Sequence, residues 1–221
     1  MSVLVFDMIR RGQSAELAAD VEAHPELAQA RDVQGVSALL WTIYVRQPEM
    51  RDLLRARVPE LDIFEAAALG EIPSLRALLD AEPGDAHAFS GDGWTPLHLA
   101  AAFARPEAVR LLLDRGADVH AVSRNPQQNQ PLHAALALGG NLEAARLLLE
   151  AGADVNATQA GGFAPLHSAA SAGRRDAADL LLERGADPAQ PDHQGHPPAH
   201  YARQRGHAEL ADWLDSTAKA S

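Results

Sequence analysis

The chain contains no cysteine, one lysine and few aromatic residues, and each scarcity excludes a class of structure or function. Without cysteine there is no disulfide, no thiolate metal ligand and no cysteine nucleophile. Aromatic residues make up 5% of the 221 residues and apolar residues 47%, so any core must consist mainly of leucine and alanine. These two residue types favour closely packed helices over a β-sandwich, in which Val, Ile and aromatics dominate.

Positive charge is also scarce, because 19 Lys and Arg residues face 30 Asp and Glu residues and the formal net charge is −11. A nucleic-acid-binding protein normally presents a basic face, so we expect no nucleic-acid partner. No apolar stretch approaches the roughly 18–20 residues that span a bilayer. The apolar part of the opening "MSVLVFDMIRRG" is too short for a secretory signal. We therefore expect a cytoplasmic protein without membrane contact.

The chain repeats itself at an interval of about 33 residues. A Leu-Leu-Leu…Gly-Ala-Asp sequence occurs at residues 111–120, 147–156 and 180–189. Each copy begins 13 or 14 residues after the histidine of a Pro-Leu-His element, at His98, His133 and His167. A fourth histidine follows 33 residues later, in "PPAH". Such a period indicates stacked units of two helices and a turn.

One unit shows how the residue types specify this structure. Thr95 suits the N-cap of a first helix, and Pro96 suits its first turn, where a missing N–H costs nothing. A second helix over "EAVRLLLDRG" places apolar residues three and four apart. Gly116 then lies where a left-handed residue ends a helix, and Gly152 and Gly185 recur at that position.

These motifs, Thr-Pro-Leu-His-x-Ala, then Leu-Leu, then Gly-Ala-Asp-Val-Asn, resemble the ankyrin repeat, most strongly over residues 90–190. The resemblance implies an all-α, curved solenoid of helix-turn-helix repeats with short turn fingers. It also implies a non-catalytic module that binds another protein on its concave face, formed by the turn tips and first helices.

Weaker copies on both sides extend the pattern to about seven repeats and make residues 1–221 a single domain. The expected repeats cover residues 2–34, 35–60, 61–91, 92–124, 125–160, 161–193 and 194–221. The step between the second and third repeats is 25 residues, so the turn near residues 55–62 has lost about eight. Whether these two repeats still stack regularly is left open by the sequence.

The recurring histidines have two interpretations, a chemical site or part of the framework. A histidine three residues after an N-cap can bond back to that cap, whereas near-equivalent copies spread along a chain make little sense for catalysis. We therefore assign a framework role to eleven positions, with no cofactor and no catalytic residue: Thr95, Pro96, His98, Gly116, Pro131, His133, Gly152, Pro165, His167, Gly185 and His200.

Two other functions remain as alternatives. The stretch "DHQGHPPAHYARQRGH" offers His193 and His196 on a turn, and these could contribute to a metal or small-ligand site. An enzyme is the weaker alternative, because there is neither a Gly-x-Ser-x-Gly element nor a glycine-rich phosphate loop.

Binding residues are sought at repeat positions that the architecture does not need. Trp94 and Phe163 share the position before the helix motif, and exposed aromatics are typical interface anchors. Alternatively, each packs on the next turn and stiffens the stack. The turn at residues 122–130 carries two extra residues and is predicted to project further than the neighbouring turns. The insertion is explained either by a binding function or by sequence drift in a tolerant loop. The predicted protein-binding set of this monomer comprises Tyr44, Trp94, Phe103, Arg124, Gln127, Asn129, Leu138, Phe163, Ser171, His196, Gln204 and Arg205.

Overall fold

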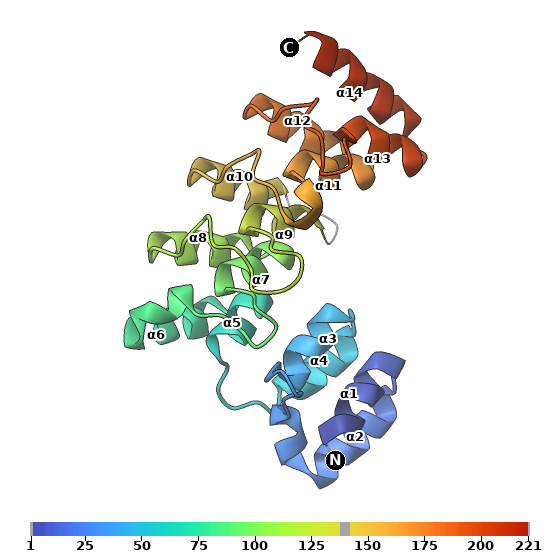
Figure 1. Ribbon diagram of the computed structural model, residues 1–221. Coiled ribbons are helices and arrows are strands. Elements are labelled where there is room, and N and C mark those ends of the chain that lie inside the picture. The colour runs from blue at the N-terminus through green and yellow to red at the C-terminus, as the bar shows by residue number, and fades with distance from the viewer. Residues whose placement is uncertain (1, 138–141, 221) are drawn as a thin grey trace.

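The computed structural model describes residues 2–137 and 142–220 and shows an elongated stack of helices (Figure 1). Within these residues there are fourteen α-helices and no β-strand, only an isolated bridge between Arg31 and Ser37. The predicted all-α solenoid is therefore confirmed.

The helices follow one another as seven inner–outer pairs. The inner helices are α1 (Ser2–Arg11), α3 (Ala38–Tyr44), α5 (Ile63–Leu69), α7 (Pro96–Ala102), α9 (Pro131–Ala137), α11 (Pro165–Ser171) and α13 (Pro198–Gln204). Each inner helix packs against the next one along the stack. The outer helices are α2 (Ser14–Ala23), α4 (Pro48–Arg55), α6 (Ile72–Ala81), α8 (Pro106–Asp114), α10 (Leu142–Glu150), α12 (Arg175–Glu183) and α14 (Ala208–Ala220).

The segment that precedes an inner helix is named below after that helix, as in "the α7 turn". Short 3₁₀ helices occur in or before three of these turns: η1 (Pro25–Gln29), η2 (Pro83–His87) and η3 (Ala160–Gly162).

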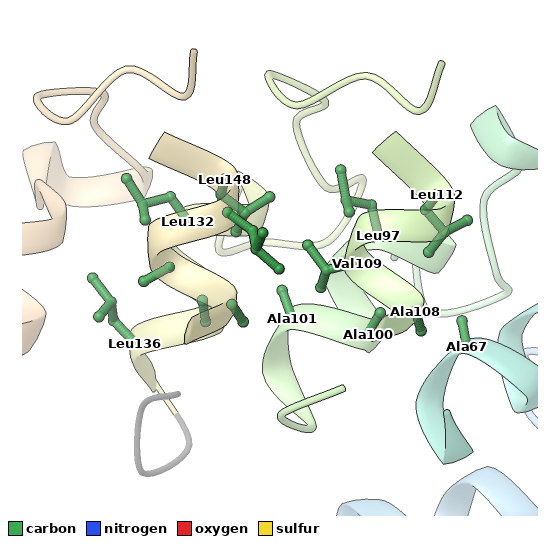
Figure 2. Close-up of a cluster of buried hydrophobic side chains, with 14 of the residues drawn as sticks. Ala67, Leu97, Ala100, Ala101, Ala108, Val109, Leu112, Leu132, Leu136 and Leu148 are labelled. Atoms are coloured by element: carbon green, nitrogen blue, oxygen red, sulfur yellow. The ribbon is translucent and has the colours of Figure 1, made fainter. Parts of the chain in front are cut away.

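One hydrophobic core runs through all seven helix pairs and is built mainly from leucine and alanine. Figure 2 shows Leu97, Val109 and Leu112 of α7 and α8 in one cluster with Leu132 and Leu148 of the next pair. Alanines on the inner helices let neighbouring helices approach closely, so the leucines of adjacent pairs pack against one another. The stack therefore holds together through contacts between neighbouring pairs, as expected of a solenoid.

Glycines end three of the outer helices in the predicted way. Gly116, Gly152 and Gly185 have φ angles of +82°, +92° and +87°. A side chain is unfavourable in this left-handed conformation, and glycine adopts it without penalty.

Successive turns in the C-terminal half are joined by main-chain hydrogen bonds. The N–H of Arg124 donates to the carbonyl of Gly93 at 2.8 Å, which joins the α9 turn to the α7 turn. The N–H of Ala160 donates to Gln127 at 2.9 Å, and that of His193 donates to Gly161 at 3.0 Å. The turns from α7 to α13 thus form one connected row beside the inner helices.

The α5 turn is missing from this row, because α4 ends at Arg55 and α5 already begins at Ile63. The α3 and α7 turns therefore meet directly, and the Cα of Gly91 lies against the carbonyl of Gln34. Arg31 in the α3 turn also donates to Asp62 at 2.8 Å. The second and third helix pairs remain stacked through α3 and α5, but the shortened turn brings together two turns that a third would otherwise separate.

Candidate binding face

Three buried histidines, one in the first turn of each of α7, α9 and α11, use both ring nitrogens within the fold. The main-chain N–H of Thr95 lies 3.3 Å from Nδ1 of His98, and Nε2 of His98 lies 2.9 Å from the carbonyl oxygen of Asn129. Because Nδ1 accepts, the neutral ring carries its proton on Nε2 and donates it to the next turn.

The other two rings repeat this arrangement. Nδ1 of His133 accepts from Gln130 at 3.3 Å, and its Nε2 donates to Phe163 at 3.2 Å. His167 is held in the same way, between Ala164 and the carbonyl of His196. Burial lowers the pKa of all three rings, that of His98 to about 4. Neutral rings with both nitrogens engaged serve to cap α7, α9 and α11 and to tie each of these helices to the next turn.

Glu65 takes this position in α5. Its carboxylate accepts from the N–H of Asp62 at 2.9 Å, while the carboxylate of Asp62 accepts from the N–H of Glu65 at 2.8 Å. This reciprocal pair is a capping box. Burial, followed by the nearby charge of Asp62, raises the pKa of Glu65.

His200 differs from the framework role expected of it, because the N-cap of α13 is Pro197. Proline has no N–H to donate, so the bond made by the other histidines cannot form. The half-buried ring of His200 instead stacks on that of His196, with ring centroids 4.0 Å apart and planes 13° apart.

His193 and His196, the two histidines that could contribute to a metal or small-ligand site, lie in the α13 turn. His193 is exposed, and Nδ1 of His196 lies 3.8 Å from a carboxylate oxygen of Asp192. Asp192 is already engaged, since its other oxygen accepts from the main chain of Gln194 and His196. Nowhere in the described part of the chain do three His, Cys, Asp or Glu side chains gather in a way that could hold a metal ion.

Three residues of the predicted binding set form a cluster of their own. Tyr44 of α3 stacks on Phe103 at the end of α7, with centroids 5.7 Å apart, and its hydroxyl donates to Asp92 at 2.8 Å. Trp94 packs in the same cluster and edge-on against His98. All three aromatic rings are half-buried, so much of their surface stabilises the stack. Burial and the neighbouring Asp92 carboxylate raise the pKa of Tyr44 above its ordinary value.

Phe163 and Ser171 lie instead at an open hollow of about 300 Å³ across α9, α11 and α13. The ring of Phe163 packs against Tyr201 at 5.1 Å and against His167 at 5.7 Å, and it remains half-exposed. The rest of the lining comes from Leu136, Ala137, His167, Ser168, Ala172 and Tyr201. Sequence reasoning did not single out Tyr201, although the three copies with His98, His133 and His167 carry no aromatic residue directly after the histidine.

The long α9 turn presents Arg124 and Gln127 at the surface, with the Arg124 guanidinium 3.8 Å from the centre of the Phe89 ring. Asn129 is only 5% exposed, so its assignment to the binding face is wrong. Its N–H donates to the hydroxyl of Ser123 and its carbonyl accepts from Ser123 and His98, which draws it into the turn.

The last members of the set lie near the end of the stack. Gln204 and Arg205 are exposed at the end of α13, and His196 is half-buried in the turn before it. Leu138 lies outside the described residues. No helix in the described ranges is long and apolar enough to cross a membrane.

Comparison with known proteins identifies the repeat. A family model of ankyrin repeats, in three copies, matches residues 63–159 and 125–192, more than half of the chain. Over 85 residues the chain is 47% identical to the probable E3 ubiquitin-protein ligase XBOS31 of Oryza sativa subsp. japonica, which covers 38% of this chain and 18% of that protein. Over 102 residues it is 46% identical to the B-cell lymphoma 3 protein of Homo sapiens, and this match covers 45% of the chain and 22% of that protein. The chain thus spans less than a quarter of the length of these relatives.

Proposed function

Because the chain belongs to the ankyrin-repeat family, whose repeats generally mediate protein–protein interaction, we propose that it binds a partner protein through its concave face without catalysis. The observation that carries this proposal is the hollow across α9, α11 and α13 with the half-exposed ring of Phe163 in its wall. An aromatic ring held on one side and open on the other is the usual form of an interface anchor.

The surroundings of Phe163 support this site. Tyr201 and His167 hold the ring in place, so little side-chain entropy is lost when a partner covers it. The serine side chains at positions 168 and 171 supply hydroxyl groups along the same hollow. Exposed Gln127, Gln204 and Arg205 provide polar groups in the neighbouring turn and helix. An apolar centre among polar groups is the common composition of a protein interface.

The activities that the relatives' names describe are not carried over to this chain. The segment matched in the rice ligase is 18% of that protein, and the one matched in the human lymphoma protein is 22%. Two proteins with such different names each match part of this chain, so we propose that the repeats contribute binding, while any activity of those proteins resides elsewhere in them.

The proposal is tested by capture of partner proteins on the immobilised protein, with quantitative mass spectrometry of what is retained. Phe163→Ala and Ser171→Arg each alter the hollow, the first by removing the anchor and the second by filling the space. The matched control is Ser74→Arg, which adds the same side chain to a half-buried serine on outer helix α6.

The expected result is a set of proteins retained by the unaltered chain and by Ser74→Arg but lost from both hollow variants. Circular dichroism verifies that all variants keep their helical content. If the same proteins are retained by all four chains, the hollow is not the contact surface.

A further inference from the structure

A second hollow, of about 480 Å³, lies near the N-terminal end of the stack, between α1, the α3 turn and α3. Its wall is largely apolar: Phe6 contacts Trp41 edge-on, with ring centroids 6.0 Å apart, and Val33 at the tip of the turn is 101% exposed. Phe6, Val33 and Trp41 thus place apolar surface together at one hollow, and clustered apolar surface of this kind is typical of a contact site. The volume accommodates a bulky apolar side chain.

This hollow is separate from the one at Phe163. Gln34 lies on its rim, and the carbonyl of Gln34 is in contact with Gly91 of the α7 turn. Further along the stack, the ring of Tyr44 stacks on that of Phe103. The linings of the two hollows have no residue in common. A ligand in the N-terminal hollow therefore touches none of the residues around Phe163.

The acidic group on the rim, Asp32, is bound mainly within its own turn. One oxygen of Asp32 accepts from the indole N–H of Trp41 at 2.7 Å. Its other oxygen accepts from the main-chain N–H groups of Gln34 at 2.9 Å and Val36 at 3.0 Å. Asp32 thus serves to fold the turn, and its carboxylate already accepts three hydrogen bonds.

The two arginines on the rim retain free donors. Arg10 uses Nη1 for Asp7 at 3.2 Å and lies 4.8 Å from the centre of the Trp41 ring, and its side chain is 53% exposed. Arg31 uses Nη1 and Nη2 for Gly35 and Asp62 and is 48% exposed. Nε of both side chains has no partner among the described residues. A carboxylate is the group that these remaining donors fit.

We propose that the N-terminal hollow binds a segment of a partner protein that carries a bulky apolar side chain next to an aspartate or glutamate. The apolar side chain occupies the space between Phe6, Val33 and Trp41, and the carboxylate pairs with Arg10 or Arg31. This site rests on residues that the proposed function does not use.

The test uses a fluorescein-labelled peptide with a central leucine between two aspartates, and its binding is followed by fluorescence anisotropy. One reference peptide replaces the aspartates by lysines, and another replaces the leucine by alanine. Val33→Glu places a charge in the mouth of the hollow, and Val122→Glu is the matched control, because Val122 is an exposed valine in the α9 turn.

The acidic leucine peptide is expected to bind more tightly than both references. Val33→Glu weakens it by at least about tenfold, while Val122→Glu and Ser171→Arg leave it unchanged. Arg10→Glu shifts the preference toward the lysine peptide. Equal binding of the three peptides, no binding of the acidic peptide, or equal affinities of the two valine variants would overturn the proposal.

Discussion

The Cα of Gly91 lies so close to the main-chain carbonyl of Gln34 that a Cβ added to Gly91 would stand 1.6 Å from the oxygen. These residues belong to the α7 and α3 turns, which meet because the α5 turn between them is shortened. The contact joins the two turns and leaves no room for a side chain at position 91.

Gly91→Ala is therefore expected to push the α3 and α7 turns apart and to lower the free energy of unfolding by about 1–3 kcal/mol. The measurement is urea unfolding followed by circular dichroism. Gly84→Ala is the control, because a Cβ there meets no atom within 4 Å. Equal stability of the two variants would mean that the turns do not touch in solution.

Tyr44→Phe removes the hydrogen bond to Asp92 but keeps the stack on Phe103. We expect a loss of about 1 kcal/mol, since a half-buried carboxylate oxygen loses a donor. Amide hydrogen exchange should rise in α3 and in the α7 turn, which this bond connects.

Tyr201→Phe is the control for this effect. It removes a similar bond, from Tyr201 of α13 to Asp192 in the turn directly before that helix, and should raise exchange only near α13. Unchanged exchange in α3 after Tyr44→Phe would contradict a stabilising contact across the missing turn.

The buried histidines predict sensitivity to acid. Burial lowers the folded-state pKa of His98 to about 4 from an ordinary value of 6.5, so the unfolded chain binds the proton first. The stability that depends on the neutral ring is complete above pH 6.5 and is lost as the pH falls toward 4, by on the order of 3 kcal/mol for this residue. His133 and His167 act in the same direction.

The measurement compares urea midpoints at pH 7 and pH 4.5 for the unaltered chain and for His98→Gln. Glutamine can accept from the N–H of Thr95, as Glu65 accepts from Asp62, but it does not titrate in this range. The variant should lose less stability on acidification, so an identical pH dependence would show that His98 does not titrate as described.

His98→Ala and His200→Ala should differ sharply, although the two residues occupy the same repeat position. The first variant leaves a buried cavity and removes the bonds to Thr95 and Asn129, at a cost of about 2–4 kcal/mol. The second removes a half-buried ring that cannot cap Pro197, and we expect less than about 1 kcal/mol. Thermal unfolding of both variants checks the order, and equal losses would contradict it.

The sequence by itself determined the features that depend on neighbours in the chain. Thr95, Pro96 and His98 specify the capped start of a helix within four residues, and Gly116 specifies its end, so the repeat and the all-α class follow from spacing alone. The missing residues near 55–62 could also be counted before the structure was known.

Only the tertiary structure decided which side chains remain available to a partner. Asn129 and Phe163 both stand at positions that the repeat does not require, yet the bonds to Ser123 bury the first while the second lines a hollow. Tyr44 is half-buried because the shortened turn brings α7 within reach. Exposure depends on contacts between residues tens of positions apart, and these arise only when the repeats stack, whereas capping and turn formation depend on a few adjacent residues.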